Sequence, residues 1–96
     1  MNRADVLEQL ARSKPALAAR YGVTDIALFG SMVRDAARVD SDIDILVSFE
    51  GPATSERYFG VQFFLEDLLC RSIDLVTDKA LRPELRPFVE KEAVHV

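Results

Sequence analysis

The sequence contains a single cysteine, no apolar run long enough to cross a membrane and no excess of basic residues. With Cys70 alone, the chain cannot form an internal disulfide or a cysteine zinc site, and we expect this residue at a buried helix position. No apolar run approaches the roughly 20 residues of a membrane span, and the N-terminus begins a mixed helical pattern rather than a signal-peptide core. We therefore expect a soluble, cytoplasmic protein.

The charge balance is acidic, with 12 Lys and Arg residues against 16 Asp and Glu residues and a net charge of −4. Nonspecific binding to nucleic acid needs a basic patch that displaces counterions, so we expect no direct binding of nucleic acid. A phosphate ligand must instead be held at a local site. A length of 96 residues without repeats or linkers predicts one domain over residues 1–96 with a single core.

Hydrophobic periodicity predicts a chain of mixed helices and strands. A helix over 4–12 is followed, after a break at Pro15, by a second helix that ends at Gly22. The other predicted elements are a strand at 23–29, a short helix at 32–37, a strand at 43–49, a long helix from 55, a strand at 72–77, a helix from Pro83 and a tail at 93–96 that forms a short strand or frays.

Two helices raise specific expectations about burial. In the long helix, Phe59 and Phe63 either complete the core or form a patch for another chain. In the last helix, the apolar residues expected to point inward are Leu85, Phe88, Val89 and Ala93. Its charged residues are expected on a solvated face; these are Glu84, Arg86, Glu90, Lys91 and Glu92. His95 has no companion ligands and is expected to be solvated.

The stretch from 27 to 47 carries the strongest chemical signal. An apolar run breaks at Gly30-Ser31, where a strand, a small-residue turn and a helix start would leave backbone N–H groups available to an anion. A second apolar run opens with Asp42 and Asp44, two positions apart. The period of a strand places both carboxylates on one face, and a hard divalent cation is the simplest group that offsets their repulsion.

Asp74 interrupts the apolar alternation of the third strand, which we expect to lie beside the strand that carries Asp44. Three carboxylates on two neighbouring strands would hold two divalent cations about 4 Å apart and bridge a triphosphate. Asp42 and Asp44 would be the main ligands, and Asp74 would complete the second site and help to accept the nucleophile's proton. The alternative is that these carboxylates only cap a turn or solvate a strand edge.

The order Gly30-Ser31, ten residues, Asp42-Ile43-Asp44 resembles the GS-x10-DxD signature of the nucleotidyltransferase superfamily that includes DNA polymerase beta. The wider pattern is similar to the minimal nucleotidyltransferases, the MntA-like antitoxins that are paired with HEPN ribonuclease toxins. This similarity covers essentially the whole chain. It implies an α+β, polymerase-beta palm-like fold with a small mixed sheet of three or four strands flanked by helices.

The resemblance also implies roles for individual residues. Gly30 and Ser31 would bind the distal phosphates of ATP, and two Mg2+ ions would be held by Asp42, Asp44 and Asp74. Arg34 matches an arginine of the family and pairs either with phosphate or with a neighbouring carboxylate.

Asp35 departs from the family pattern, because relatives usually have glycine at this position. Aspartate tolerates a left-handed backbone better than most residues, so we expect the turn to form. Its negative charge near the incoming phosphates is expected to weaken nucleotide affinity.

By this resemblance, the expected activity is transfer of AMP from ATP to a hydroxyl, with tyrosine as the implied acceptor, on a partner HEPN-type toxin. The chain would then act as an antitoxin in a hetero-oligomer. An alternative is an antitoxin that neutralises its partner by binding alone. Transfer to a small molecule, as in aminoglycoside-modifying relatives, is less favoured because those relatives usually carry an additional helical domain.

Overall fold

The computed structural model describes residues 1–34, 38 and 41–96. The elements are, in chain order, α1 (Arg3–Tyr21), β1 (Val23–Phe29), a 3-10 turn η1 (Gly30–Met32), β2 (Ile43–Phe49), α2 (Ser55–Leu69), β3 (Ile73–Thr77), α3 (Arg86–Glu92) and β4 (Val94–His95). The predicted α+β class is confirmed. The helix predicted at 32–37 begins instead as η1, and its residues 35–37 lie outside the described part of the chain.

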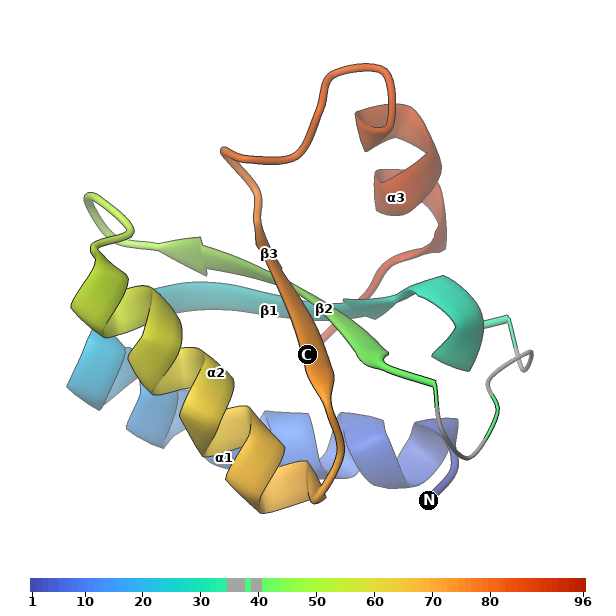
Figure 1. Ribbon diagram of the computed structural model, residues 1–96, viewed down its shortest axis with the longest axis horizontal. Coiled ribbons are helices and arrows are strands. Elements are labelled where there is room, and N and C mark those ends of the chain that lie inside the picture. The colour runs from blue at the N-terminus through green and yellow to red at the C-terminus, as the bar shows by residue number, and fades with distance from the viewer. Residues whose placement is uncertain (35–37, 39–40) are drawn as a thin grey trace.

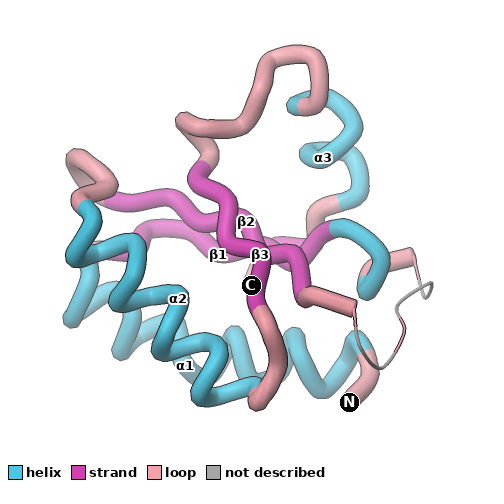
Figure 2. The backbone as a smooth tube through the Cα atoms, in the orientation of Figure 1, coloured by secondary structure: helices cyan, strands magenta, loops and turns pink. Residues whose placement is uncertain are grey.

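The four strands form a mixed sheet in the order β3-β2-β1-β4. β1 pairs antiparallel with β2 and β4, whereas β2 and β3 run parallel. Both long helices, α1 and α2, lie side by side on one face of the sheet, and α3 lies at the other face (Figures 1 and 2).

Alternation along β2 divides its side chains between the two faces. Ile43 and Ile45 are completely buried in the main core, together with residues of α1 and α2. Leu46 belongs to a smaller cluster on the opposite face, which also contains Ala27 and Leu81. Asp44 lies on that second face, as the period of two predicts.

The ends of α1, β1 and β2 lie where the sequence predicts them or within one residue. The side chain of Asn2 accepts a hydrogen bond from the Asp5 N–H at 2.9 Å and so caps α1. The helix ends at Gly22, whose φ of 73° is the left-handed conformation that glycine adopts without strain. β1 and β2 have the predicted ranges, and β3 begins one residue later than predicted.

α1 runs unbroken through Pro15, so the predicted division into two helices is wrong. A proline at this position removes the hydrogen bond that the Ala11 carbonyl would otherwise accept. Ala11 and Pro15 are both exposed, so this carbonyl can bind water, whereas Leu10 and Leu17 are completely buried. Burial of the apolar side stabilises one continuous helix across the proline.

The last helix begins at Arg86, three residues later than predicted. A helix from Pro83 would have placed Pro87 in its second turn, where the missing N–H would break a hydrogen bond. Starting at Arg86 puts Pro87 in the first turn, where no donor is needed. The inward assignment is wrong for Leu85 and Phe88, which are 48% and 72% exposed, and right for Val89, which packs against the smaller cluster.

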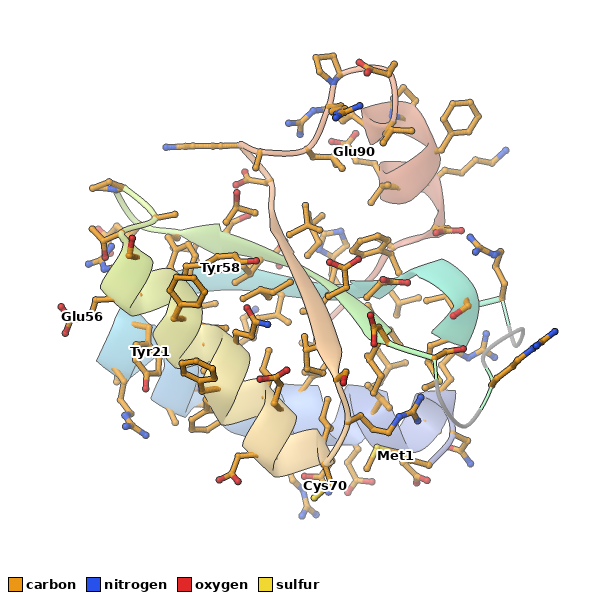
Figure 3. All side chains as sticks on the ribbon, in the orientation of Figure 1. Met1, Tyr21, Glu56, Tyr58, Cys70 and Glu90 are labelled. Carbon is orange, nitrogen blue, oxygen red and sulfur yellow. The ribbon has the colours of Figure 1, made fainter. Side chains whose placement is uncertain are left out.

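Three other burial expectations are settled by the structure. Cys70 is exposed at the end of α2, with a φ of 53°, so its expected burial is wrong (Figure 3). Phe59 and Phe63 are 49% and 63% exposed and stack with ring centres 6.2 Å apart, which favours the patch over the core. His95 is exposed, as predicted, and its Nδ1 lies 2.7 Å from Asp25 Oδ2.

Within the described residues, no helix combines the length and the apolar character needed to cross a membrane.

Candidate active site

A tight turn at Gly30 ends β1 and begins the site. Gly30 has a φ of 77°, in the left-handed region, and is buried. A Cβ at this position would overlap the carboxyl group of Asp44, whose Cγ would lie only 2.8 Å away. Glycine is therefore required here both by the backbone conformation and by the close approach of Asp44.

Asp44 and Asp74 lie opposite each other in the parallel pairing of β2 and β3. Asp44 is half-buried and Asp74 is exposed. The pKa of Asp44 is raised to about 6, first by burial and then by the charge of Asp74, a hydrogen bond with the Asp74 side chain and the charge of Asp42. The predicted meeting of two carboxylates on adjacent strands is thus present, and the charge of Asp74 disfavours ionisation of Asp44.

The backbone of β3 next to Asp74 is held by Tyr58 of α2. The Tyr58 hydroxyl donates a hydrogen bond to the Leu75 carbonyl in β3, next to Asp74. Burial, and secondly the negative charge of Asp74, raise the pKa of the Tyr58 phenol. Tyr58 lies on the side of α2 that faces the sheet (Figure 3), so this bond fixes the position of β3 against the helix.

Asp42 precedes β2 and is exposed. The neighbouring backbone is held by Arg71, whose guanidinium donates hydrogen bonds to the carbonyls of Arg38 and Ser41. Arg71 comes from the connection between α2 and β3, and nothing in the local sequence around Asp42 signals it. The charge of Asp42 acts on Asp44, as its contribution to the raised pKa indicates.

The donor chemistry of these carboxylates suits a hard cation such as Mg2+, which prefers oxygen ligands. A cation would also offset the repulsion that raises the pKa of Asp44. Among the described residues, however, no group of three or more His, Cys, Asp or Glu side chains is arranged to hold a metal ion. The structure therefore pairs Asp44 with Asp74, and a metal set that includes Asp42 stays a prediction.

Glu92, at the end of α3, also reaches the turn. Its Oε1 accepts a hydrogen bond from the Gly30 N–H at 2.9 Å, and both of its carboxylate oxygens accept from Arg34 Nη1, at 3.1 and 2.8 Å. Arg34 was predicted to pair either with phosphate or with a neighbouring carboxylate, and in the structure it pairs with the carboxylate of Glu92. The sequence placed Glu92 on a solvated helix face, since no local pattern reports a contact across 62 residues.

The expectation that the backbone N–H groups of the turn point freely at an anion needs correction. The Gly30 N–H is bound by Glu92, and a hydrogen bond from the Ser31 N–H to Asp44 lowers the pKa of that carboxyl. The first two donors of the turn are thus satisfied by carboxylates of the protein itself. Asp35, which was expected to weaken phosphate binding, lies outside the described residues.

An open cleft of about 710 Å³ lies between the turn and α3. This volume is within the range of small-molecule sites. The cleft combines apolar surface with groups of both charges, and its lining residues are Phe29, Gly30, Arg34, Asp44, Phe88, Val89, Lys91 and Glu92. The exposure of Phe88 is explained by this position at the wall of the cleft.

Comparison with known proteins assigns the family. The pattern that defines the nucleotidyltransferase domain matches residues 10–96. The chain belongs to the nucleotidyltransferase family. This nucleotidyltransferase is 39% identical over 87 residues to the protein adenylyltransferase MntA of Thermococcus cleftensis, an alignment that covers 91% of this chain and 88% of that protein.

Solved structures agree with this assignment. A structure assigned as a minimal nucleotidyltransferase is 36% identical, with a TM-score of 0.82, over 98% of this nucleotidyltransferase and 95% of that chain. A second likeness, at 21% identity and a TM-score of 0.61, is to a complex of the tri-AMPylated HEPN toxin of Shewanella oneidensis with its MNT antitoxin, over 98% of this chain and 67% of that one. At this identity the second likeness shows the fold alone.

Proposed function

We propose that this nucleotidyltransferase transfers AMP from ATP to a tyrosine hydroxyl of a HEPN-type toxin and thereby acts as its antitoxin. The observation that carries the proposal is the Asp44–Asp74 pair beside the Gly30 turn. The relationship to a protein adenylyltransferase supports AMP as the transferred group. The fold shared with an antitoxin that accompanies an AMPylated HEPN toxin supports the choice of partner.

In the proposed reaction, the acceptor oxygen attacks the α-phosphorus of ATP, the bond to the β-phosphate bridging oxygen breaks, and pyrophosphate leaves. The proton of the acceptor hydroxyl passes to Asp74, which is exposed on β3 at the edge of the sheet. Gly30 lets the Asp44 carboxyl approach the backbone of the turn closely, because a Cβ at this position would overlap that carboxyl. Arg34, at the wall of the cleft, faces the side on which the distal phosphates would lie.

Two Mg2+ ions belong to the proposal, held by Asp42, Asp44 and Asp74. Bound there, they would supply positive charge that neutralises the phosphates of ATP. Asp44 and Asp74 are already neighbours, and the charge of Asp42 acts on the same group. The role of these residues is to provide oxygen ligands at the end of two rigid strands.

The partner would bring the acceptor to an open site. The cleft is shallow and Asp74 lies on an outer strand, so a tyrosine on another protein can approach without displacing any element of this chain. We therefore propose a hetero-oligomer of this chain with its toxin.

The test uses purified protein, the HEPN-type toxin, Mg2+ and ATP labelled on the α-phosphate. We expect label on the toxin, and we expect none from ATP labelled on the γ-phosphate, because pyrophosphate is the leaving group. Mass spectrometry should locate AMP on a tyrosine, and changing that tyrosine to Phe should abolish labelling. The Asp42→Ala plus Asp44→Ala variant should be inactive, whereas Glu84→Ala, which removes an exposed carboxylate elsewhere, should label normally. Equal labelling by wild type and the double variant would refute the proposal.

A second candidate function, neutralisation by binding alone, is favoured by the exposed pair Phe59 and Phe63 on α2. In this case a Phe59→Asp variant would lose toxin neutralisation in cells. The Asp42→Ala plus Asp44→Ala variant would retain it. The opposite pattern, with neutralisation lost only with the two aspartates, would eliminate the binding-only function.

A further inference from the structure

Glu92 occupies an unusual position for a residue on a short surface helix. It is the last residue of α3, and its side chain is 25% exposed, whereas the side chain of Arg34, its partner, is 58% exposed. One carboxylate thus joins the backbone of the turn, the arginine that follows the turn, and the C-terminal helix. Glu92 lies 62 residues from Gly30 and 58 residues from Arg34 along the chain, so it reaches both only in the fold.

The hydrogen bond to Gly30 satisfies a specific need of the turn. The first N–H groups of any helical turn have no partner inside that turn. Gly30 begins η1 and is buried, so an unbound N–H would lie away from water. Glu92 binds this donor while Asp44 binds the next one, from Ser31. Two carboxylates from different elements therefore fix the orientation of the turn.

The bond to Arg34 fixes a second group. An exposed arginine samples many rotamers, and binding a ligand with it requires that this freedom be lost. Both oxygens of Glu92 contact Arg34 Nη1, and within residues 1–34, 38 and 41–96 no other side chain binds the remaining donors of the guanidinium, which can then serve a ligand in the cleft. The carboxylate thus restrains Arg34 without consuming its capacity to bind phosphate.

We infer that Glu92 is a positioning residue of the nucleotide site, which holds the Gly30–Ser31 turn and aims Arg34 without contacting the reacting atoms. This inference rests on the proposed function, because it takes ATP to be the ligand of the cleft. A pair with one largely exposed partner contributes little to global stability. The bond to the buried Gly30 N–H contributes more, because removing its acceptor leaves that donor unpaired. Loss of Glu92 should therefore lower both the affinity for nucleotide and the melting temperature, and a variant that keeps an acceptor should restore both.

The opposite role for Glu92 would be to compete with ATP for the Gly30 N–H and Arg34. A carboxylate on a backbone N–H and an arginine is chemically similar to a bound phosphate oxygen. If ATP had to displace Glu92, removing its charge would strengthen ATP binding. The two roles therefore predict opposite signs for the same measurement.

The experiment measures ATP affinity by calorimetric titration with Mg2+ and, in parallel, the kinetics of AMP transfer. For Glu92→Ala we expect KM for ATP and Kd to rise about tenfold, with kcat changed less, and the melting temperature to fall by several degrees because the Gly30 N–H loses its acceptor. Glu92→Gln keeps an oxygen that accepts from the Gly30 N–H and from Arg34, so it should restore most of the affinity. Glu90→Ala is the matched control, since Glu90 lies on the same helix and forms an exposed pair with Arg86 at 3.3 Å; it should bind ATP as wild type does (Figure 3).

Several outcomes would overturn the inference. Tighter ATP binding by Glu92→Ala would assign the competitor role, and unchanged affinity would assign no role in the site. An unshifted Gly30 amide resonance in the 15N–1H spectrum of Glu92→Ala would show that the bond to the turn is absent. The proposed function fails separately if the wild type binds ATP but transfers no AMP to the toxin, because the affinity and the amide resonance still test Glu92. If the wild type bound no ATP at all, both would be overturned.

Discussion

Replacing Gly30 with alanine tests the close contact on which the site is built. Gly30 and Gly51 both have a positive φ, of 77° and 78°. An alanine Cβ at Gly51 would meet only Arg57 Nη1, at 3.9 Å, whereas at Gly30 it would overlap the carboxyl of Asp44. Gly51→Ala therefore reports the cost of the backbone conformation alone, and Gly30→Ala reports that cost together with the overlap.

The magnitudes follow from these two contributions. A non-glycine residue in the left-handed region costs about 1 kcal/mol, which is the loss expected for Gly51→Ala. Overpacking in a tightly packed site adds about 1–3 kcal/mol, so Gly30→Ala should lose roughly 2–4 kcal/mol of the free energy of unfolding. For a chain of 96 residues, each kcal/mol lowers the melting temperature by about 4–8 °C.

The assay is urea unfolding of both variants, together with Gly30→Ala in an Asp44→Ala background. Removing the Asp44 carboxyl removes the group that the new Cβ would overlap. The Cβ of residue 44 remains, 3.0 Å from the new Cβ, so in that background we expect Gly30→Ala to lose most of its extra cost over Gly51→Ala but to stay slightly more costly. If Gly30→Ala costs the same as Gly51→Ala in the wild type, or if the Asp44→Ala background restores nothing, the contact between the turn and Asp44 is not as described.

Three further predictions follow from other contacts. Because the pKa of Asp44 is raised from 3.8 to about 6 in the folded protein, stability is lost as the pH rises from about 3.8 to about 6, and the loss is complete above that range. Asp44→Asn should therefore stabilise the metal-free protein at pH 7.5 by about 1 kcal/mol after allowance for exposure, and the gain should vanish towards pH 4 in unfolding curves measured with EDTA. A Cβ at Gly60 would lie 2.9 Å from Tyr21 Cδ1. Gly60→Ala should therefore lower the free energy of unfolding, measured in urea, by about 1–2 kcal/mol despite the better helix propensity of alanine. A rise in the free energy of unfolding would contradict this packing. Phe88→Ala, which removes the exposed ring at the wall of the cleft, should raise KM for ATP several-fold, whereas Phe59→Ala, on α2, should leave KM unchanged; equal values for the two variants would exclude Phe88 from the nucleotide site.

The parts of the site that the sequence predicted are those set by local rules. The alternation around Asp44 and the apolar runs of β1 and β2 depend on neighbouring residues, and both strands have their predicted ranges. The pairing of Asp44 with Asp74 required only that β2 and β3 be neighbours, which the structure confirms.

The parts that the sequence did not predict depend on contacts between distant segments or on competing local effects. Glu92 resembles any other charge on a surface helix until the fold brings it to Gly30. Pro15 predicted a break, but burial of the apolar side of α1 outweighed the missing hydrogen bond. Cys70 was assigned to the helix interior, yet it ends α2 in a left-handed conformation that no local pattern specified.

The alternation of β2 has a practical consequence for work on the complex. Ile43 and Ile45 secure the strand from one side, and Asp44 projects from the other. The residues that stabilise the fold are therefore different from the one proposed to act on ATP. Under the proposed function, a chain with Asp44 replaced would keep its fold and bind a toxin without transferring AMP to it.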